Sequence, residues 1–294
     1  MPAVACLVAD PTRYPLDRTL VAEAARAISG TVRWLAEAEA AEVTTDHHDP
    51  DTATRRLAPV LAGSQLDLNV LPPEQRRKQL LLCDMDSTII TIECIDELAD
   101  LAGIKPQIAA VTRRAMNGEL DFTAALRERV ALLAGLPSAA IATVISERLT
   151  LMPGALTLVR TMRHHGARTA LVSGGFTAFT RHVQEQCGFD LQEANELEID
   201  DGRLTGRLSG ELRGAPAKLQ ALLRLREELG IETVATMAVG DGANDLPMLQ
   251  AAGLGIAFRA HERVRTAAPA RIDHGDLTAL LFLQGYSRPE FVSG

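Results

Sequence analysis

Two aspartates separated by one methionine follow a short apolar run in the stretch LLLCDMDSTIITIE, residues 80–93. Carboxylates this close repel each other unless a cation lies between them or one keeps its proton, so Asp84 and Asp86 suggest chemistry. A carboxylate can attack phosphorus to form an aspartyl-phosphate, and a second carboxyl group can transfer protons. We therefore consider Asp84 as a nucleophile and Asp86 as a general acid and base. The alternative is a turn in which both side chains cap backbone N–H groups.

Further polar residues could complete a phosphate site. Asp241 and Asp245 lie four residues apart in GDGANDLPML, and so many carboxylates need a hard divalent cation, expected to be Mg²⁺, to share a pocket with phosphate. The Ser-Gly-Gly loop at 173–175 can offer a hydroxyl and backbone N–H groups to phosphate oxygens. Lys218 begins a predicted helix, whose N-terminus favours anions. A helix N-cap and a solvated helix lysine are the alternatives for the aspartates and for Lys218.

Three short apolar runs must position these residues. QLLLC, RTALV and VATMAV each stop at one of the polar loops and are followed by helix-like sequence, which is typical of strand-loop-helix units in a parallel α/β sheet. Ligands bind outside the carboxyl ends of such strands. The sequence therefore predicts a Rossmann-like parallel sheet with Asp84, Asp86, Ser173 and Asp241 along one edge.

The sequence between the first two of these strands has a helical period and is longer than one crossover helix requires. It predicts an inserted helical cap over approximately residues 94–152. The later stretch ELEIDDGRLTGRL predicts a β-hairpin that turns at Asp201-Gly202.

The first 77 residues predict a separate, small α+β domain. ACLVA and LDLNV read as strands, TLVAEAARAISG and TATRRLAPVLA as helices, and the Ala/Glu-rich segment 31–43 could be helical despite some alternation. LPPEQRRKQ then interrupts the pattern with two prolines and a charge run, which gives domains of residues 1–77 and 78–294. Because every candidate residue follows this boundary, we expect residues 78–294 to fold and act alone.

Composition excludes several functional classes. The chain has 294 residues, 47% hydrophobic and 23% charged, which suits one large folded domain with a smaller companion. A net charge of -8 argues against nonspecific nucleic-acid binding. No signal-like or membrane-length apolar stretch is present, so neither export nor membrane spanning is expected. The cysteines form no Cys-X-X-Cys pair and fit a reducing cytoplasm, with neither a zinc site nor a disulfide framework: Cys6, Cys83, Cys94 and Cys187.

The order of DMDST at 84–88, SGG at 173–175, Lys218 and GDGAND at 240–245 resembles the four motifs of the haloacid dehalogenase-like phosphatases, and most closely those that hydrolyse phosphoserine. The similarity covers about residues 78–290. It implies Asp84 as nucleophile and Mg²⁺ ligand, Asp86 as acid/base with its backbone carbonyl on the metal, and Asp241 as a further ligand. It also implies phosphate and substrate contacts by Ser173, Gly174, Lys218 and Asn244, with Asp245 supporting the metal shell.

The resemblance extends to substrate choice. It implies that Glu93 meets the amino group of the substrate and that three cap residues close over it: Met116, Phe122 and Arg129. Residues 1–77 resemble the amino-acid-binding ACT-like domain. The implied enzyme hydrolyses the small molecule O-phospho-L-serine, as the last step of serine biosynthesis. It is expected in the cytoplasm, binds neither nucleic acid nor membrane, and has a homodimer as a possible assembly.

Three rival functions remain open. A related enzyme could pass the phosphoryl group to an acceptor such as homoserine, or prefer another small phosphomonoester. A noncatalytic phosphoaspartate switch also uses clustered aspartates and a lysine, but the second aspartate and the cap argue against it, because a switch must keep its phosphoryl group. An amino-acid sensor would depend on the N-terminal unit alone.

Overall fold

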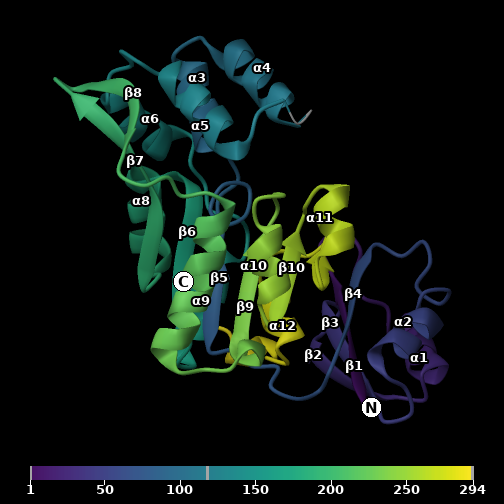
Figure 1. Ribbon diagram of the computed structural model, residues 1–294. Helices are drawn as coiled ribbons and strands as arrows, with labels where there is room; N and C mark the ends of the chain where they lie inside the picture. The colour runs from purple at the N-terminus through teal and green to yellow at the C-terminus, as the bar shows by residue number, and fades with distance from the viewer. Residues whose placement is uncertain (1, 117–118, 293–294) are drawn as a thin grey trace.

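Two β-sheets organise the chain (Figure 1), whose computed structural model describes residues 2–116 and 119–292. The smaller sheet is antiparallel and has the order β2 (Thr31–Ala36), β3 (Ala40–Thr45), β1 (Ala3–Ala9), β4 (Leu66–Leu71). The larger has the order β11 (Ala270–Ile272), β10 (Leu254–Phe258), β9 (Thr236–Gly240), β5 (Leu80–Cys83), β6 (Arg168–Phe176), β7 (Leu191–Asp200), β8 (Arg203–Ser209). Its neighbouring strands pair in parallel except for β8, which is antiparallel to β7, and this sheet confirms the predicted fold class.

The three predicted strands of the large sheet are neighbours. β5 lies between β6 and β9, so the chain continues to one side of β5 and later returns to the other. In an open α/β sheet, such a reversal leaves a crevice at the carboxyl ends of the strands. The loops that follow β5, β6 and β9 therefore meet at this crevice.

Helices cover both faces of the large sheet. Leu80 and Leu82 point to one face and Leu81 and Cys83 to the other, and all four are buried, which explains why this strand is a continuous apolar run. The first face carries α9 (Ala215–Leu229), α10 (Leu246–Ala251) and α11 (Glu262–Ala267). The second carries α7 (Ala155–His164), α8 (Thr177–Cys187) and α12 (Ala279–Leu283). Short 3-10 turns occupy Thr233–Ala235 and Arg288–Glu290.

The predicted helical insert is present as a cap of four helices above the crevice (Figure 1): α3 (Cys94–Leu101), α4 (Lys105–Met116), α5 (Phe122–Ala131) and α6 (Ala139–Glu147). The chain enters and leaves the cap through two adjacent segments. Ile90 and Leu151 form an isolated β-bridge, and the Met152 N–H donates to the Ile89 carbonyl at 2.8 Å. None of the described helices is long and apolar enough to cross a membrane.

The β7–β8 hairpin turns where the sequence predicted. Asp200 pairs with Arg203, and both Asp201 and Gly202 have positive φ, as a two-residue hairpin turn requires. β8 then contacts the cap, because the Gly135 N–H donates to the Leu204 carbonyl at 2.8 Å. The cap is thus attached to the core at the hairpin as well as at its entry segments.

The N-terminal unit has the strand and helix order expected of an ACT-like domain, with α1 (Arg18–Ala27) after β1 and α2 (Pro50–Leu57) after β3. The helical interpretation of residues 31–43 is wrong, because this segment forms β2 and the start of β3. Val32 and Trp34 are half-buried and alternate with the exposed Thr31 and Arg33, and Ala40, Ala41 and Val43 are fully buried in the sheet. Burial on a pleated surface therefore outweighs the helical preference of Ala and Glu.

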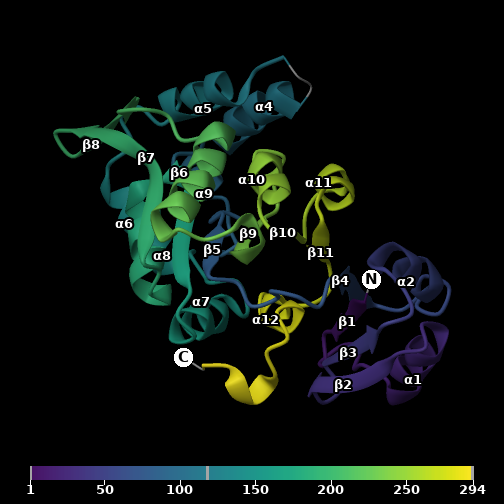
Figure 2. The ribbon, with the colours of Figure 1, turned by 60° about the horizontal axis from the view of Figure 1, so that its bottom comes forward.

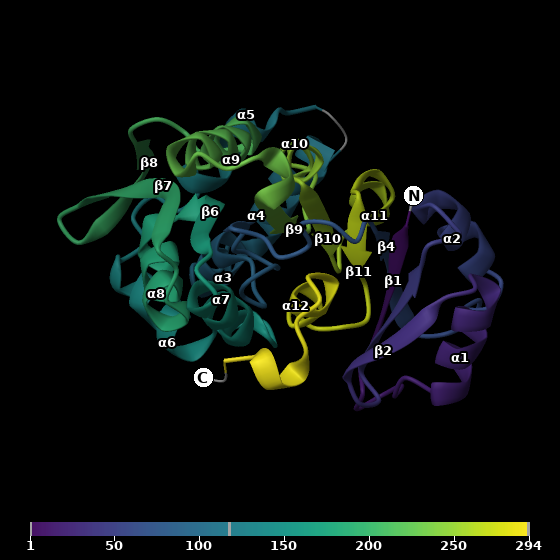
Figure 3. The ribbon, with the colours of Figure 1, turned by 90° about the horizontal axis from the view of Figure 1, so that it is seen from below.

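The N-terminal sheet packs against the larger unit through β1, which is buried along its whole length. One face of β1 lies under α1 and α2, whereas Cys6 and Val8 on the other face belong to the same core as α12 (Figure 2; Figure 3). At the sheet edge, the Asn69 amide bonds to both the N–H and the carbonyl of Arg271, at 3.0 and 2.8 Å. The Asp67 carboxylate accepts the N–H groups of residues 273–275. The two units thus share a hydrophobic core.

Candidate active site

Asp84 lies directly after β5 at the crevice, and its N–H donates to the Val239 carbonyl of the neighbouring strand. Its side chain is buried. Oδ1 accepts the Met85 N–H at 2.8 Å and contacts Nζ of Lys218 at 2.7 Å. Both contacts are made by the same oxygen, so neither of them uses Oδ2.

Lys218 is the central cation of the site, although it lies on a helix. Its residue is only 1% exposed, and Nζ also contacts Oδ1 of Asp245 at 2.6 Å. Burial opposes the charged form, but the carboxylates of Asp245 and Asp84 outweigh this effect and raise the pKa of Lys218. Oδ2 of Asp245 accepts the Gly242 N–H at 2.9 Å, so both oxygens of this buried carboxylate already have donors.

Three carboxylates form a group that fits a metal ion. One oxygen from each of Asp84, Asp241 and Asp245 lies within 4.8 Å of the others. Burial, followed by the charge of Asp84, raises the pKa of Asp241 to about 6, so the cluster needs additional positive charge to be fully ionised. Thr88, which the sequence did not single out, donates its hydroxyl to Asp241 at 2.9 Å. Hard oxygen ligands of this kind suit a divalent cation.

Asp86 occupies a different environment from Asp84. Oδ1 accepts the Cys94 N–H at the start of α3 at 2.9 Å, and Oδ2 accepts the Ser173 hydroxyl at 3.4 Å. Burial, with the neighbouring Glu93 carboxylate as the next cause, raises the pKa of Asp86 to about 7. A Cβ at Gly175 would lie 2.6 Å from Oδ2, so this position requires glycine for the loop to approach Asp86.

The cap and the loops after β5, β6 and β9 enclose a cavity of about 310 Å³. It is lined by most of the residues that the sequence singled out: Asp84, Asp86, Glu93, Phe122, Arg129, Ser173, Gly174, Asp241 and Asn244. Lys218 and Asp245 lie behind Asp84 instead of on the cavity wall. Met116 ends α4, and its side chain lies outside the described residues.

The cap side of the cavity carries opposite charges. Glu93 accepts the Ser87 hydroxyl at 2.7 Å, and the half-buried Arg129 donates Nε–H to the Ala125 carbonyl at 3.4 Å. Burial lowers the pKa of Arg129, and the carboxylates of Asp96, Glu93 and Asp86 oppose this shift. His261 also lines the cavity, and no motif or periodicity in the sequence indicated it.

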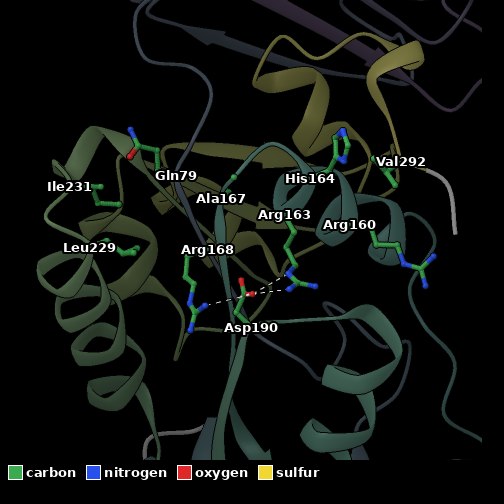
Figure 4. Close-up of a pocket in the computed structure, with 11 residues that line it drawn as sticks. Gln79, Arg160, Arg163, His164, Ala167, Arg168, Asp190, Leu229, Ile231 and Val292 are labelled. Atoms are coloured by element: carbon green, nitrogen blue, oxygen red, sulfur yellow. Dashed lines mark hydrogen bonds and ion pairs between the residues drawn. The ribbon is translucent and has the colours of Figure 1, made fainter.

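A second, larger hollow lies away from this site (Figure 4). It has a volume of about 660 Å³ and is lined by the residues that precede β5 and β6 and by the end of α7. Arg163 and Arg168 converge there on Asp190, at 3.0 and 3.7 Å. None of the predicted site residues lines this hollow, and two of its arginines, Arg163 and Arg168, already share a carboxylate.

The segment that carries these residues is similar in sequence to known proteins. Residues 81–250 match the family model of the haloacid dehalogenase-like hydrolases. The chain is 47% identical over 215 residues to phosphoserine phosphatase SerB2 of Mycobacterium tuberculosis, which corresponds to 73% of this chain and 52% of that protein. The chain therefore spans about half the length of this curated relative.

Two solved structures extend the likeness to three dimensions. The unliganded form of a probable phosphoserine phosphatase from Vibrio cholerae superposes with a TM-score of 0.79 and 33% identity, covering 98% of this chain and 88% of that one. A phospho-aspartyl intermediate analogue of phosphoserine phosphatase superposes with a TM-score of 0.65 and 39% identity, covering 70% of this chain and 98% of that one.

Proposed function

Because the chain belongs to the haloacid dehalogenase-like hydrolases, and within them to the phosphoserine phosphatase family, we propose that it hydrolyses O-phospho-L-serine to L-serine and phosphate. The observation that carries this proposal is the 310 Å³ cavity, which is lined by Asp84 and Asp86 and also by one acidic and one basic side chain, Glu93 and Arg129. One end offers groups for a phosphate, and the other offers groups for an amino acid. The reaction would yield serine from its phosphate ester.

Asp84 is the nucleophile in this proposal. Its Oδ1 is held by the Met85 N–H and by Lys218, which leaves Oδ2 to attack phosphorus and form an aspartyl-phosphate. The fixed carboxylate supplies orientation, and Lys218 offsets negative charge that phosphate brings to the buried site. The solved phospho-aspartyl analogue of a phosphoserine phosphatase supports this role.

Asp86 moves the protons. A carboxyl group with a pKa raised to about 7 can be protonated when the serine oxygen departs and ionised when water attacks the aspartyl-phosphate. Its Oδ1 stays bonded to the Cys94 N–H, which fixes the side chain, and its contact with the Ser173 hydroxyl places it beside the phosphate loop.

We assign Mg²⁺ to Asp84 and Asp241, with the backbone carbonyl of Asp86 as the ligand that the family pattern adds. The buried, mutually repelling carboxylates fit a hard divalent cation. When bound, Mg²⁺ would neutralise phosphate oxygens and make phosphorus more electrophilic. Asp245 positions Lys218 and the Gly242 backbone, since both of its oxygens are occupied by them.

Glu93 and Arg129 recognise the amino acid part of the substrate. Arg129 can meet a carboxylate with two parallel N–H bonds, and Glu93 can accept bonds from an ammonium group. Phe122, on the cap, closes the same cavity. Ser173 and the Gly174 backbone hold the phosphate, and Asn244 contacts the substrate from the loop after β9.

A substrate panel tests this function. Phosphate release from phosphoserine, phosphothreonine, phosphohomoserine and sugar phosphates would be measured with Mg²⁺ and with a chelator. We expect the highest kcat/KM for phosphoserine and loss of activity in the chelator. A higher value for another ester, or transfer of the phosphoryl group to added homoserine in preference to water, would assign a different reaction to the site.

A further inference from the structure

Asn195 on β7 lies outside every sequence motif, yet it joins two separate phosphate-binding segments. We propose that Asn195 is a positioning residue that holds the Ser173–Gly174 loop against the segment that begins α9 and leads to Lys218. The inference rests on the proposed function, in which both segments bind phosphate.

The Asn195 side chain is fully engaged. The residue is 2% exposed, and its Nδ2 donates to the Gly174 carbonyl at 2.8 Å and to the Arg213 carbonyl at 3.0 Å. Its Oδ1 accepts the Arg213 N–H at 2.7 Å. Both amide hydrogens and the oxygen are therefore used, and each bond goes to backbone outside regular pairing.

The local strand geometry explains why a side chain is needed here. β6 pairs with β7 up to Val172 and Glu193, and pairing resumes only at Phe176 and Asn195. Residues 173–175 leave the ladder at this shift, as in a β-bulge that redirects backbone toward a site. Asn195 replaces the lost backbone contacts with side-chain bonds.

Asn195 also bonds to the second segment, which the Arg213 side chain ties to β7 through Glu193 at 2.6 Å. Arg213 precedes Gly214, the N-cap of α9, and Lys218 follows within the first turn and a half of that helix. Because Gly214 has no side chain, it cannot cap the helix with a side-chain hydrogen bond. The bonds to the Arg213 N–H and carbonyl therefore fix the point from which α9 carries Lys218 toward Asp84.

The cap meets the same two segments. A Cβ at Gly174 would lie 3.0 Å from the Phe122 ring, and a Cβ at Gly214 would lie 2.9 Å from it. The ring of Phe122 thus rests on both segments at once. A change in their spacing would alter the phosphate cradle and the surface on which the cap closes.

Asn195→Asp is the main test, because aspartate has nearly the same shape and keeps the acceptor for Arg213 but loses both donors. Asn195→Ser shortens the side chain and removes the link without adding the negative charge that Asn195→Asp brings. Gln192→Ala is the matched control, since Gln192 lies on the same strand and accepts from Thr180, outside the phosphate segments. Inhibition by inorganic phosphate, Mg²⁺ binding by calorimetry without phosphate, and thermal unfolding would be measured on each variant.

We expect phosphate affinity, and kcat/KM for both phosphoserine and p-nitrophenyl phosphate, to fall about 10- to 100-fold in the two Asn195 variants, because small misplacements of binding groups have effects of this size. Mg²⁺ affinity should stay within about threefold of wild type, since Asn195 contacts no carboxylate of the cluster. The control should resemble wild type in all three measurements.

Phosphate affinity within about twofold of wild type in folded Asn195→Asp would overturn the proposal. So would a parallel fall of Mg²⁺ and phosphate affinity, or failure of both variants to fold, because either result would assign Asn195 to general stability. If wild type does not hydrolyse phosphoserine, the proposed function fails, while the phosphate affinities still decide the role of Asn195.

Discussion

A buried lysine flanked by two carboxylates determines the electrostatics of the site. Burying an ammonium group is costly unless it is paired, and Lys218 has Asp84 and Asp245 at 2.7 and 2.6 Å. This arrangement offsets charge at Asp84, the proposed nucleophile, without occupying the cavity. The remaining carboxylate, Asp241, accepts the Thr88 hydroxyl, and burial with the charge of Asp84 raises its pKa to about 6.

Replacing Asp86 by asparagine tests proton transfer. The variant should keep the fold and the Asp84–Asp241 cluster but lose general acid and base catalysis, a contribution of about 100- to 10,000-fold for phosphoserine. The loss should be smaller for p-nitrophenyl phosphate, whose leaving group needs no proton. Steady-state kinetics with both substrates on one preparation gives the comparison, and equal losses would contradict the assigned role.

Replacing Arg129 by alanine tests substrate recognition. Losing a charge-assisted bond to a carboxylate in a closed cavity costs about 2–5 kcal/mol. At about 1.4 kcal/mol per tenfold, kcat/KM for phosphoserine should fall about 30- to several-thousand-fold. Hydrolysis of p-nitrophenyl phosphate, which has no carboxylate, should change far less. Parallel losses would show that Arg129 supports the cap structure instead of the substrate.

The sequence located the residues that follow strands, because strand ends in a parallel sheet must converge. Asp84, Ser173 and Asp241 are of this kind. The sequence does not indicate the contacts of Thr88 and Asn195, because their partners lie 18 to 153 residues away and the contacts depend on side-chain geometry. Roles of the cap residues came from family resemblance, because helix periodicity does not distinguish one surface arginine from another.

The β7–β8 hairpin matters as an element because it supports the cap. Gly206 has φ +78°, and a Cβ there would lie 2.9 Å from Ala134 Cβ and 3.0 Å from the Ala131 carbonyl oxygen. Gly206→Ala should therefore combine the left-handed penalty of about 1–2 kcal/mol with an overpacking cost of about 1–3 kcal/mol. Thermal unfolding and phosphoserine kinetics would measure the loss.

Gly210→Ala is the matched control for that variant. Gly210 has φ +73° on the same hairpin, but a Cβ there would meet nothing within 4 Å. Both variants carry the backbone penalty, and only Gly206→Ala displaces the cap. Equal unfolding temperatures and equal kcat/KM values in the two variants would show that the hairpin does not support the cap.

At the element scale, the sequence predicted strands and helices well where burial and periodicity agree. β5 is apolar on both faces, and its sequence indicated a buried strand. In residues 31–43, Ala and Glu favour a helix while the alternation favours a strand, and tertiary burial decided the outcome. Such conflicts depend on the pairing of β3 with β1, which local sequence does not contain.

At the scale of the whole molecule, the shared core changes the expectation for a shortened chain. A boundary near residue 77 stays a prediction, but Cys6 and Val8 pack in one core with α12. Removing residues 1–77 would expose this apolar surface and leave the N–H groups of residues 273–275 without the Asp67 carboxylate.

We therefore expect the fragment 78–294 to unfold at a lower temperature than the full chain and to bind a hydrophobic dye more strongly. Asp67→Ala in the full chain should show a smaller change of the same sign, about 1–3 kcal/mol, because it removes only the carboxylate bonds. An unchanged unfolding temperature and dye binding in the fragment would mean that the N-terminal unit contributes nothing to the core of the larger one.

Trapping the covalent intermediate tests the central claim most directly. Enzyme mixed with Mg²⁺ and phosphoserine that carries a labelled phosphate would be quenched in acid within milliseconds, and the labelled peptide identified by mass spectrometry. The account predicts label on Asp84, released by hydroxylamine as expected for an acyl phosphate, and neither label nor turnover in Asp84→Asn. Label on another residue, or phosphoserine turnover by Asp84→Asn, would contradict it.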